Sequence, residues 1–175
     1  KRRDNRAITV EKEKNEQLLL NTLPAKVVRD LLERGKSEPE RFSKVTIMFI
    51  DIVDFTRLTA SMDPKLLIDE LNEIYTVFDE ITEKNKCERI KTIGDAYMAV
   101  CGMPQPDTNH AENMLHSALE IRQYINERSK TTKRKWEVRI GLHSGRTVGG
   151  IIGIRKYIYD VFGDTINTAS RMQAC

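Results

Sequence analysis

Residues 44–51, KVTIMFID, form a nearly continuous apolar run rich in β-branched side chains. Such a run is typical of a strand that is buried on both faces of a sheet. Two carboxylates, Asp51 and Asp54, stand at its end, although aspartate weakens strands and is costly to bury without a partner. These two acids therefore need a chemical explanation.

Helical and strand patterns alternate after this run. Residues 57–84 have apolar side chains at every third or fourth position, which predicts one amphipathic helix; its apolar positions are Leu67, Leu71, Ile74, Phe78 and Ile81. Residues 87–102 read as two strands joined at Gly94-Asp95, because glycine suits a tight hairpin turn. The pattern thus predicts a helix followed by a hairpin.

The remainder of the chain repeats this alternation. Asn109 and Glu112 resemble a capping box that opens a second helix, whose inward positions are Met114, Ala118, Ile121 and Ile125. Residues 135–145 predict a fourth strand. Residues 157–174 predict a strand, a turn at Gly163-Asp164, and a helix that Asp164 is expected to cap.

The element order from 44 to 142 is therefore β-α-β-β-α-β, the ferredoxin-like split unit of an α+β fold, or α/β sandwich. This topology places the first strand beside the third and antiparallel to it, so Asp51 should meet Asp95 at one sheet edge. Oxygen ligands suit Mg²⁺ or Mn²⁺, and two such ions assist phosphoryl transfer. The alternatives are structural: Asp95 as a turn residue and Asp54 as a helix cap.

Residues 1–43 predict a helical linker. Leu20, Leu23, Val27 and Leu31 form one helical stripe, Pro24 should divide it into two helices, and Gly35 should end it. Two interpretations stay open: a helix packed on its own domain, or a dimerising, signal-transmitting helix from an upstream module. The chain begins without Met, and we expect it to follow a longer amino-terminal region.

Composition narrows the class of protein only slightly. A length of 175 residues suits one domain. A formal charge of +3 is too small to argue for a nucleic-acid partner. Three cysteines fit neither a disulfide framework nor a paired-cysteine metal site, so we expect reduced thiols. No apolar run approaches the roughly 18 residues of a membrane span.

Four segments resemble, in order and spacing, the catalytic domain of class III nucleotidyl cyclases. They are FIDIVDFT (49–56), KTIGDAYMAV (91–100), RIGLHSGRTVGGIIG (139–153) and YDVFGDTINTASRM (159–172). The stretch LLLNTLP (18–24) is similar to the linker that precedes this domain in many membrane-bound and receptor cyclases. The resemblance implies a cytoplasmic catalytic domain over residues 44–175, attached to an upstream sensor or membrane region.

The resemblance also implies a two-metal site for Mg²⁺ or Mn²⁺. Its ligands would be Asp51, Asp95 and the backbone carbonyl of Ile52. The turn that follows, formed by Val53, Asp54, Phe55 and Thr56, would bind phosphates, and Arg146 would contact the terminal phosphates. The family commonly has glycine at the position of Asp54, so a carboxylate there is a departure.

Base recognition falls, by resemblance, to Lys91 and Asp160. Lysine can donate to adenine N1 and aspartate can accept from the 6-amino group, whereas guanine mismatches both groups. Guanylyl cyclases carry glutamate and cysteine or similar residues at these places. The resemblance therefore implies ATP as the substrate and cyclic AMP as the product, with Asn167 and Arg171 stabilising the transition state.

A chain that carries every one of these residues implies a homodimer with two active sites, each completed across the interface. Two alternatives remain: a catalytically silent, regulatory cyclase-like domain, and a guanylyl cyclase. The family's last strands, which carry a phosphate-binding lysine, are expected beyond Cys175.

Overall fold

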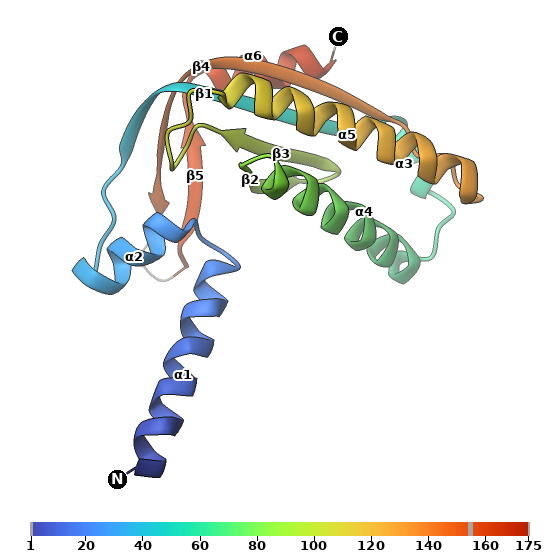
Figure 1. Cartoon of the computed structure of the whole chain (residues 1–175). Helices are drawn as coiled ribbons and strands as arrows, with labels where there is room; N and C mark the ends of the chain where they lie inside the picture. Colours follow the sequence, from blue (N-terminus) through green and yellow to red (C-terminus); the bar gives the residue numbers. More distant parts are fainter. Residues whose placement is uncertain (1, 154–155, 175) are drawn as a thin grey trace.

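The structure is a computed structural model that describes residues 2–153 and 156–174. It contains one five-stranded antiparallel sheet and six helices within these residues (Figure 1). The strands are β1 (Glu40–Ile52), β2 (Cys87–Ile93), β3 (Ala96–Cys101), β4 (Val138–Ile152) and β5 (Ile158–Phe162). The helices are α1 (Arg2–Leu20), α2 (Ala25–Arg34), α3 (Phe55–Thr59), α4 (Pro64–Lys84), α5 (His110–Thr131) and α6 (Asp164–Ala174).

The strand order β2-β3-β1-β4-β5 confirms the α+β fold and the predicted split unit. β1 lies in the centre, antiparallel to β3 on one side and to β4 on the other. The pairing of Ile50 with Tyr97 carries the end of β1 toward the β2–β3 turn. The predicted neighbourhood of the first and third strands is therefore correct.

Alternate side chains of β1 enter two different cores, which explains its continuous apolar run. Met48, Ile50 and Ile52 belong to one core cluster, which includes α4 and α5 residues. Val45, Ile47 and Phe49 belong to a second cluster on the opposite face of the sheet. Because successive strand side chains point to opposite faces, both faces of β1 need apolar residues.

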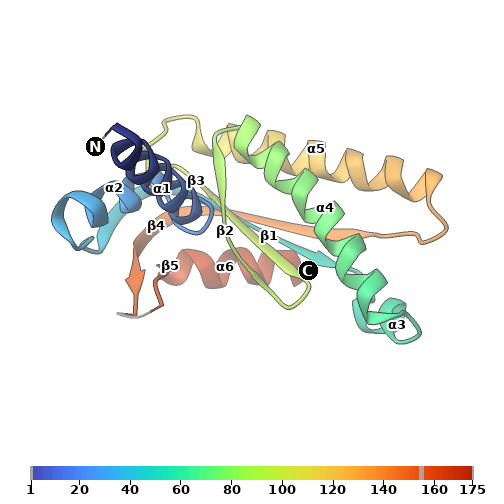
Figure 2. The same cartoon turned by 90° about the horizontal axis from the view of Figure 1, so that it is seen from below.

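Helices cover the two faces unequally. α4 and α5 lie on the face of the first cluster, and α6 lies on the opposite face (Figure 2). α2 also packs on this second face, through Val27 and Val28, which are buried there. The sheet is thus the middle layer between the α4–α5 pair and the α2–α6 side.

The linker divides at the predicted position. α1 ends at Leu20 and α2 begins at Ala25, directly after Pro24, and Gly35 closes α2 in the left-handed conformation that suits glycine. Leu23 is buried in the second core cluster, whereas Leu18 and Leu20 stay exposed. α2 therefore packs on its own domain, while α1 extends away from the sheet (Figure 1).

The prediction of one continuous helix over residues 57–84 was wrong. The chain forms the short α3 and then α4, with residues 60–63 between them. Asp63 caps α4 by accepting hydrogen bonds from the amides of Lys65 and Leu66, and Pro64 occupies the first turn. A capping carboxylate followed by proline is a helix-start signal that outweighs the apolar periodicity across it.

Two smaller expectations also need correction. α5 begins after Asn109, but the Asn109 side chain makes no capping hydrogen bond, so the capping box does not form. The Asp107 carboxylate instead accepts from the Asn109 amide and the Asn113 side chain. The fourth strand continues to Ile152, well beyond the predicted residue 145, because β5 pairs with its second half.

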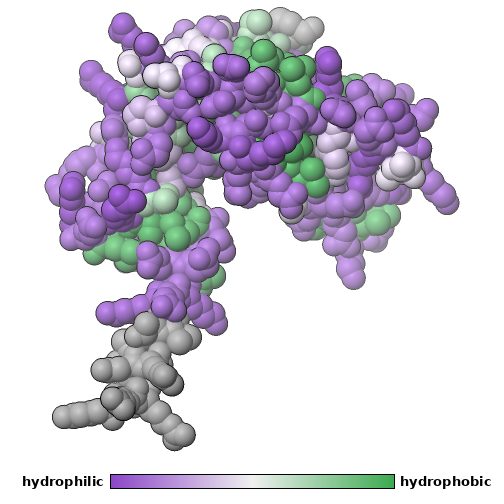
Figure 3. Space-filling view, viewed as in Figure 1, coloured by the Kyte–Doolittle hydropathy of each residue, from purple (hydrophilic) through white to green (hydrophobic). Residues whose placement is uncertain are grey.

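The surface seen in Figure 3 is largely hydrophilic, with an apolar patch over α2 and the neighbouring strand ends. Exposed apolar residues in this part of the chain include Leu20, Leu32, Ile152 and Ile158. Among residues 2–153 and 156–174, no helix combines the length and apolar character needed to cross a membrane.

Candidate active site

The fold brings Asp51 and Asp95 together, as the strand order predicts. Asp51 is the penultimate residue of β1, and Asp95 lies in the turn that joins β2 and β3. The Asp51 carboxylate lies close enough to Asp95 to raise the pKa of its carboxyl group. Gly94 supports this turn with a φ of 62°, a conformation that glycine adopts without strain. Two acids forty-four positions apart therefore converge at one sheet edge.

Three neighbours of these acids were missed in the sequence. The Arg139 guanidinium binds the Asp51 carboxylate at 2.9 Å, and the Gln173 side chain donates to the same oxygen at 3.3 Å. The Tyr75 hydroxyl donates to the backbone carbonyl of Asp95 at 3.0 Å. Arg139 stands directly opposite Asp51 in the β1–β4 register, so a correct strand pairing would have revealed it.

Electrostatics at this end of the sheet favour a cation. Burial raises the pKa of Asp95, and the neighbouring Asp51 carboxylate raises it further, while Arg139 acts in the opposite direction. Burial, followed by the charges of Asp95 and Asp51, raises the pKa of Tyr75 to about 12. A carboxyl whose ionisation is disfavoured by burial and by a second carboxylate is a fitting place for a divalent ion.

The available donors suit a hard cation whose remaining ligands are oxygen atoms of the substrate and of water. Within the described ranges, no group of three or more His, Cys, Asp or Glu side chains could hold a metal. Asp51 and Asp95 supply two carboxylates, and Mg²⁺ commonly binds one or two carboxylates together with substrate phosphates. The side chain of Ile52 is buried in the core, so this residue can offer only its backbone carbonyl.

The turn after β1 contains the expected phosphate-binding residues Val53, Asp54, Phe55 and Thr56. Asp54 precedes α3 with a φ of 53°, in the left-handed region where glycine is favoured. Its side chain makes no capping hydrogen bond and instead pairs with Arg57 at 2.9 Å. The backbone conformation thus supplies a physical reason for the glycine that the family commonly has here.

Lys91 and Asp160 form a second pair, although they lie on opposite edge strands. The Lys91 Nζ atom donates to Asp160 Oδ2 at 2.5 Å, and the Val161 amide donates to Asp160 Oδ1 at 2.8 Å. β2 and β5 are the first and last strands of the sheet order. The sheet must therefore curl until its two edges approach each other at this pair.

A β-bulge aims Lys91 toward Asp160. Arg89 pairs with Ala99 and Lys91 pairs with Met98, so Ile90 is an extra residue in β2. Met98 faces the second core cluster, where Ile90 also packs. Without the bulge, strand alternation would turn Lys91 to the α4 face, where Arg89 pairs with Asp79.

Asn167 and Arg171 lie on a different face of α6 from the residues that touch the sheet. Ala169 is buried, and Gln173 reaches Asp51, whereas Asn167 and Arg171 are exposed. Positions two residues apart on a helix point in nearly opposite directions, since each residue turns the helix by about 100°. Within one chain these two side chains therefore point away from the metal-binding candidates.

Arg146 is also separated from these carboxylates. Asp51 pairs with Arg139, whereas the segment containing Arg146 pairs with β1 near Phe42 and Val45. Arg146 lies seven positions after Arg139 in β4, which corresponds to about 23 Å along a strand. One chain therefore unites Asp51 with Asp95 and Lys91 with Asp160, but it does not bring Arg146 to either carboxylate.

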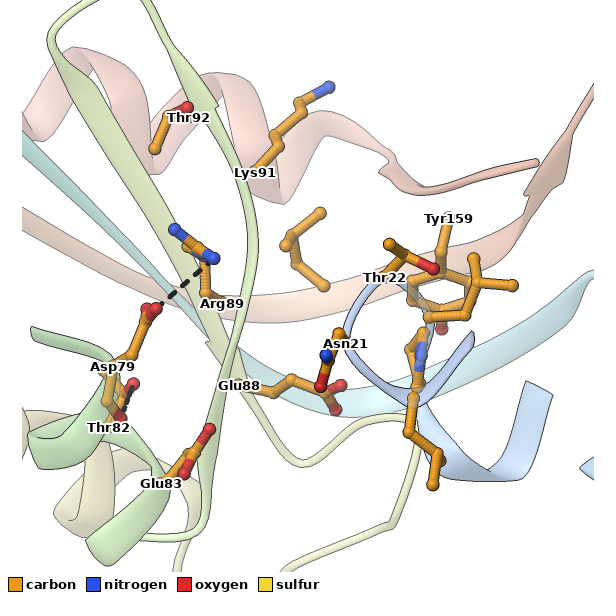
Figure 4. Close-up of a pocket in the computed structure, with 14 residues that line it drawn as sticks. Asn21, Thr22, Asp79, Thr82, Glu83, Glu88, Arg89, Lys91, Thr92 and Tyr159 are labelled. Carbon is orange, nitrogen blue, oxygen red and sulfur yellow. Dashed lines mark hydrogen bonds and ion pairs between the residues drawn. The ribbon is translucent and has the colours of Figure 1, made fainter. Parts of the chain in front are cut away.

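A cavity of about 350 Å³ adjoins Lys91 (Figure 4). Its wall joins the α1–α2 connection to β2 and α4, and it includes Asn21, Thr22, Glu83, Glu88 and Tyr159. Burial, with a smaller effect of Glu83, raises the pKa of Glu88 to about 7. The linker therefore lies across this cavity from the strand that carries Lys91.

Comparisons with known proteins identify the family of this chain. A family profile described as "Adenylate and Guanylate cyclase catalytic domain" matches residues 37–175. "Receptor-type guanylate cyclase gcy-13" from Caenorhabditis elegans is 41% identical over 167 residues, which are 94% of this chain and 16% of that protein. The chain thus spans only a small part of that relative's length.

Solved structures similar to this chain are also nucleotidyl cyclase domains. The "catalytic core of a rhodopsin-guanylyl cyclase with converted specificity in complex with ATPalphaS" has a TM-score of 0.73 and 35% identity, covering 79% of this chain and 75% of that one. The "adenylyl cyclase CyaB from P. aeruginosa" has a TM-score of 0.71 and 25% identity, covering 79% and 74%. The chain belongs to the class III adenylyl and guanylyl cyclase catalytic-domain family.

Proposed function

We propose that this cyclase domain converts ATP to 3′,5′-cyclic AMP and pyrophosphate. The observation that carries the proposal is the Lys91–Asp160 pair, with its Nζ–Oδ2 distance of 2.5 Å. A lysine donor and a carboxylate acceptor that already lie side by side present one donor and one acceptor to the edge of a purine base. No large movement within the chain is needed to create this pattern.

The pattern matches adenine and opposes guanine. The Lys91 ammonium has three protons, so it can keep its bond to Asp160 while it donates to adenine N1. An Asp160 oxygen has a second lone pair that can accept from the 6-amino group. Guanine would place an N1–H donor against lysine and a 6-oxo acceptor against aspartate, and buried mismatches of this kind are strongly rejected.

We assign the reaction chemistry to the pair of acids. Class III cyclases use divalent metal ions, and Asp51, Asp95 and the Ile52 carbonyl would hold two Mg²⁺ or Mn²⁺ here. Such ions would lower the pKa of the ribose 3′-hydroxyl and neutralise charge on the triphosphate. The two carboxylates would hold the metal ions at the end of β1. There, the amides of Phe55 and Thr56 at the start of α3 would face the phosphates.

We propose that a symmetric homodimer completes each active site. Cyclase domains act as dimers, and in this chain Asn167 and Arg171 occupy the face of α6 that is turned away from Asp51. A second chain would bring them to the nucleotide, where asparagine would orient the ribose and arginine would stabilise charge on the α-phosphate. Arg146 would likewise reach the terminal phosphates in the assembled site.

A guanylyl cyclase is the second candidate, because the relatives named above include guanylate cyclases. Identity over the whole domain reports mainly the shared scaffold, whereas the substrate is chosen by the few groups that touch the base. For this reason we give the Lys91–Asp160 pair greater weight. We also propose that an amino-terminal sensor or membrane region, as in receptor cyclases, acts through α1 on a cytoplasmic catalytic domain.

The decisive test is product formation from ATP and from GTP, with Mn²⁺ or Mg²⁺, over a range of protein concentrations. We expect cyclic AMP to rise faster than linearly with protein concentration, because each site needs two chains. The assay should be repeated on a form extended beyond Cys175. Cyclic GMP as the main product would favour the second candidate, and no cyclic product from either form would favour a regulatory domain.

A further inference from the structure

Two buried cysteines face each other across the β2–β3 hairpin. Cys87, the first residue of β2, pairs in register with Cys101, the last residue of β3. Directly opposed residues of antiparallel strands have Cα atoms about 4.5 or 5.5 Å apart, and disulfides form at Cα separations of about 4.4–6.8 Å. Both thiols are free in the structure, so the backbone already has a spacing that a disulfide accepts.

The two thiols also affect each other's ionisation. The neighbouring Cys101 thiol lowers the pKa of Cys87, with burial opposing and the Ser117 hydroxyl assisting. The Cys87 thiol in turn raises the pKa of Cys101. The Ser117 Oγ–Cys87 Sγ distance is 3.5 Å. Cys87 is therefore the more easily deprotonated, and hence the more nucleophilic, member of the pair.

A route from solvent leads to Cys87. This residue is only 4% exposed, but it lines an open cleft of about 790 Å³ between α2 and the loop after β3. Lys26, Arg29 and Lys86 also line this cleft. β2 is an edge strand of the sheet, and Cys87 is its first residue. Local unfolding at this end of the strand breaks the fewest contacts. A small oxidant can therefore approach the thiol of Cys87.

We infer that Cys87 and Cys101 form a reversible oxidation site. When a peroxide oxidises this pair, the two cysteines form a cross-strand disulfide. The Cys87 thiolate attacks one peroxide oxygen, the O–O bond breaks, and sulfenic acid forms at Cys87 with loss of hydroxide. That hydroxide takes the proton of Cys101, giving water. The Cys101 sulfur then attacks Cys87, the S–O bond breaks, and the released hydroxide takes the proton first lost by Cys87. Two thiols and one peroxide thus give one disulfide and two waters.

The site is linked to the nucleotide site through the hairpin. Lys91 lies four residues after Cys87 on β2, and Asp95 lies in the turn at the far end of the same hairpin. A disulfide would fix the open end of the hairpin and restrict the fraying of β2. This link rests on the proposed function, in which Lys91 of β2 binds the base, so we expect the KM for the nucleotide to differ between reduced and oxidised protein.

The test is treatment of the folded chain with hydrogen peroxide, followed by alkylation of free thiols under denaturing conditions and mass spectrometry. A Cys175→Ser background removes the third cysteine. We expect one product that is lighter by two hydrogen atoms and lacks both alkyl groups, with a peptide linking Cys87 to Cys101. Dithiothreitol should restore both alkylation sites, and oxidised protein should unfold at a higher temperature.

Matched variants separate the two roles. Cys101→Ser should accumulate a dimedone-reactive sulfenic acid at Cys87, and Cys87→Ser should give neither sulfenic acid nor disulfide. Circular dichroism checks that each variant remains folded, and the linked peptide from the parent chain tests the site without any variant. Full alkylation of both cysteines after peroxide would overturn the site. An identical KM in the two redox states would overturn its link to the nucleotide site.

Discussion

The two residue pairs of the proposed active site differ in their electrostatics. Asp51 and Asp95 carry like charges, and among the described residues Arg139 forms an ion pair with Asp51. Lys91 and Asp160 carry opposite charges and bind each other. The first pair is therefore short of positive charge, whereas the second is already neutral.

This difference shows why similar side chains serve different tasks. A pair of carboxylates gains stability from a divalent ion, because the ion removes both their repulsion and their desolvation cost. An ion pair has no such need, so its remaining donors and acceptors are available to read a base. Net charge distinguishes the proposed metal site from the proposed base site.

The largest expected effect is a change of substrate. Lys91→Glu together with Asp160→Cys replaces the two opposite charges. The double variant should lose the donor and acceptor pattern for adenine and should accept guanine. We expect the ratio of kcat/KM for ATP over GTP to fall by about a thousandfold or more. Parallel assays with both nucleotides measure this ratio. Lys135→Glu, at an exposed lysine, is the control, and an unchanged ratio would contradict the proposed role of the pair.

Removing one charge from the acidic pair should abolish most of the activity. Asp95→Asn is expected to lower kcat by about a hundredfold or more, since electrostatic groups at a reaction centre typically contribute this much. The same variant should unfold at a slightly higher temperature without metal, because like-charge repulsion is lost. Asp69→Asn on the exposed side of α4 is the matched control. Full activity in Asp95→Asn would exclude its role as a metal ligand.

Glu88, which lines the cavity beside Lys91, should make stability depend on pH. Its pKa rises from 4.5 to about 7 in the folded chain, so the folded state holds an extra proton between these values. The free energy of unfolding should therefore decrease as pH rises from about 4.5 to about 7, by about 1–3 kcal/mol. Urea unfolding at several pH values should show this slope in the parent chain. Glu88→Gln should flatten it, and an equal slope in both proteins would refute the assignment.

Arg139 allows the acidic pair to be adjusted without removing a carboxylate. Arg139→Gln should free Asp51 and remove a nearby positive charge, so metal should bind about fivefold more tightly, equivalent to about 1 kcal/mol. Titration of the unfolding temperature with Mn²⁺ measures this effect independently of catalysis. Arg122→Gln on the exposed face of α5 is the control. Weaker metal binding in Arg139→Gln would mean that the arginine orients Asp51 instead of competing with the ion.

The smallest expected effect concerns Asp54. Its left-handed φ of 53° suits glycine, so Asp54→Gly should relieve strain, and the loss of the exposed pair with Arg57 should cost little. We expect about 0.5–1 kcal/mol of added stability, measured by urea unfolding, and a lower KM for the nucleotide. Asp54→Asn separates the two causes, because asparagine tolerates this conformation but removes the charge. A lower KM in Asp54→Gly alone would assign the effect to the backbone.

Much of this protein was determined by the sequence itself. The run around Ile47 and Ile50 required a strand buried on both faces, Pro24 required a break in the linker, and the element order required Asp51 to meet Asp95. These predictions were correct because each depends on a local rule: side-chain alternation, the missing amide of proline, and the limited ways of connecting strands. The residues of the proposed base site were predicted from their motifs.

Tertiary structure alone decided the remaining features. The sequence did not reveal that Arg139 neutralises Asp51, that Ile90 forms a bulge that turns Lys91, or that Cys87 faces Cys101, because each depends on strand register. It also did not reveal that Asn167 and Arg171 point away from Asp51. A shift of one residue moves every side chain of a strand to the other face, and only packing of the whole sheet selects one register.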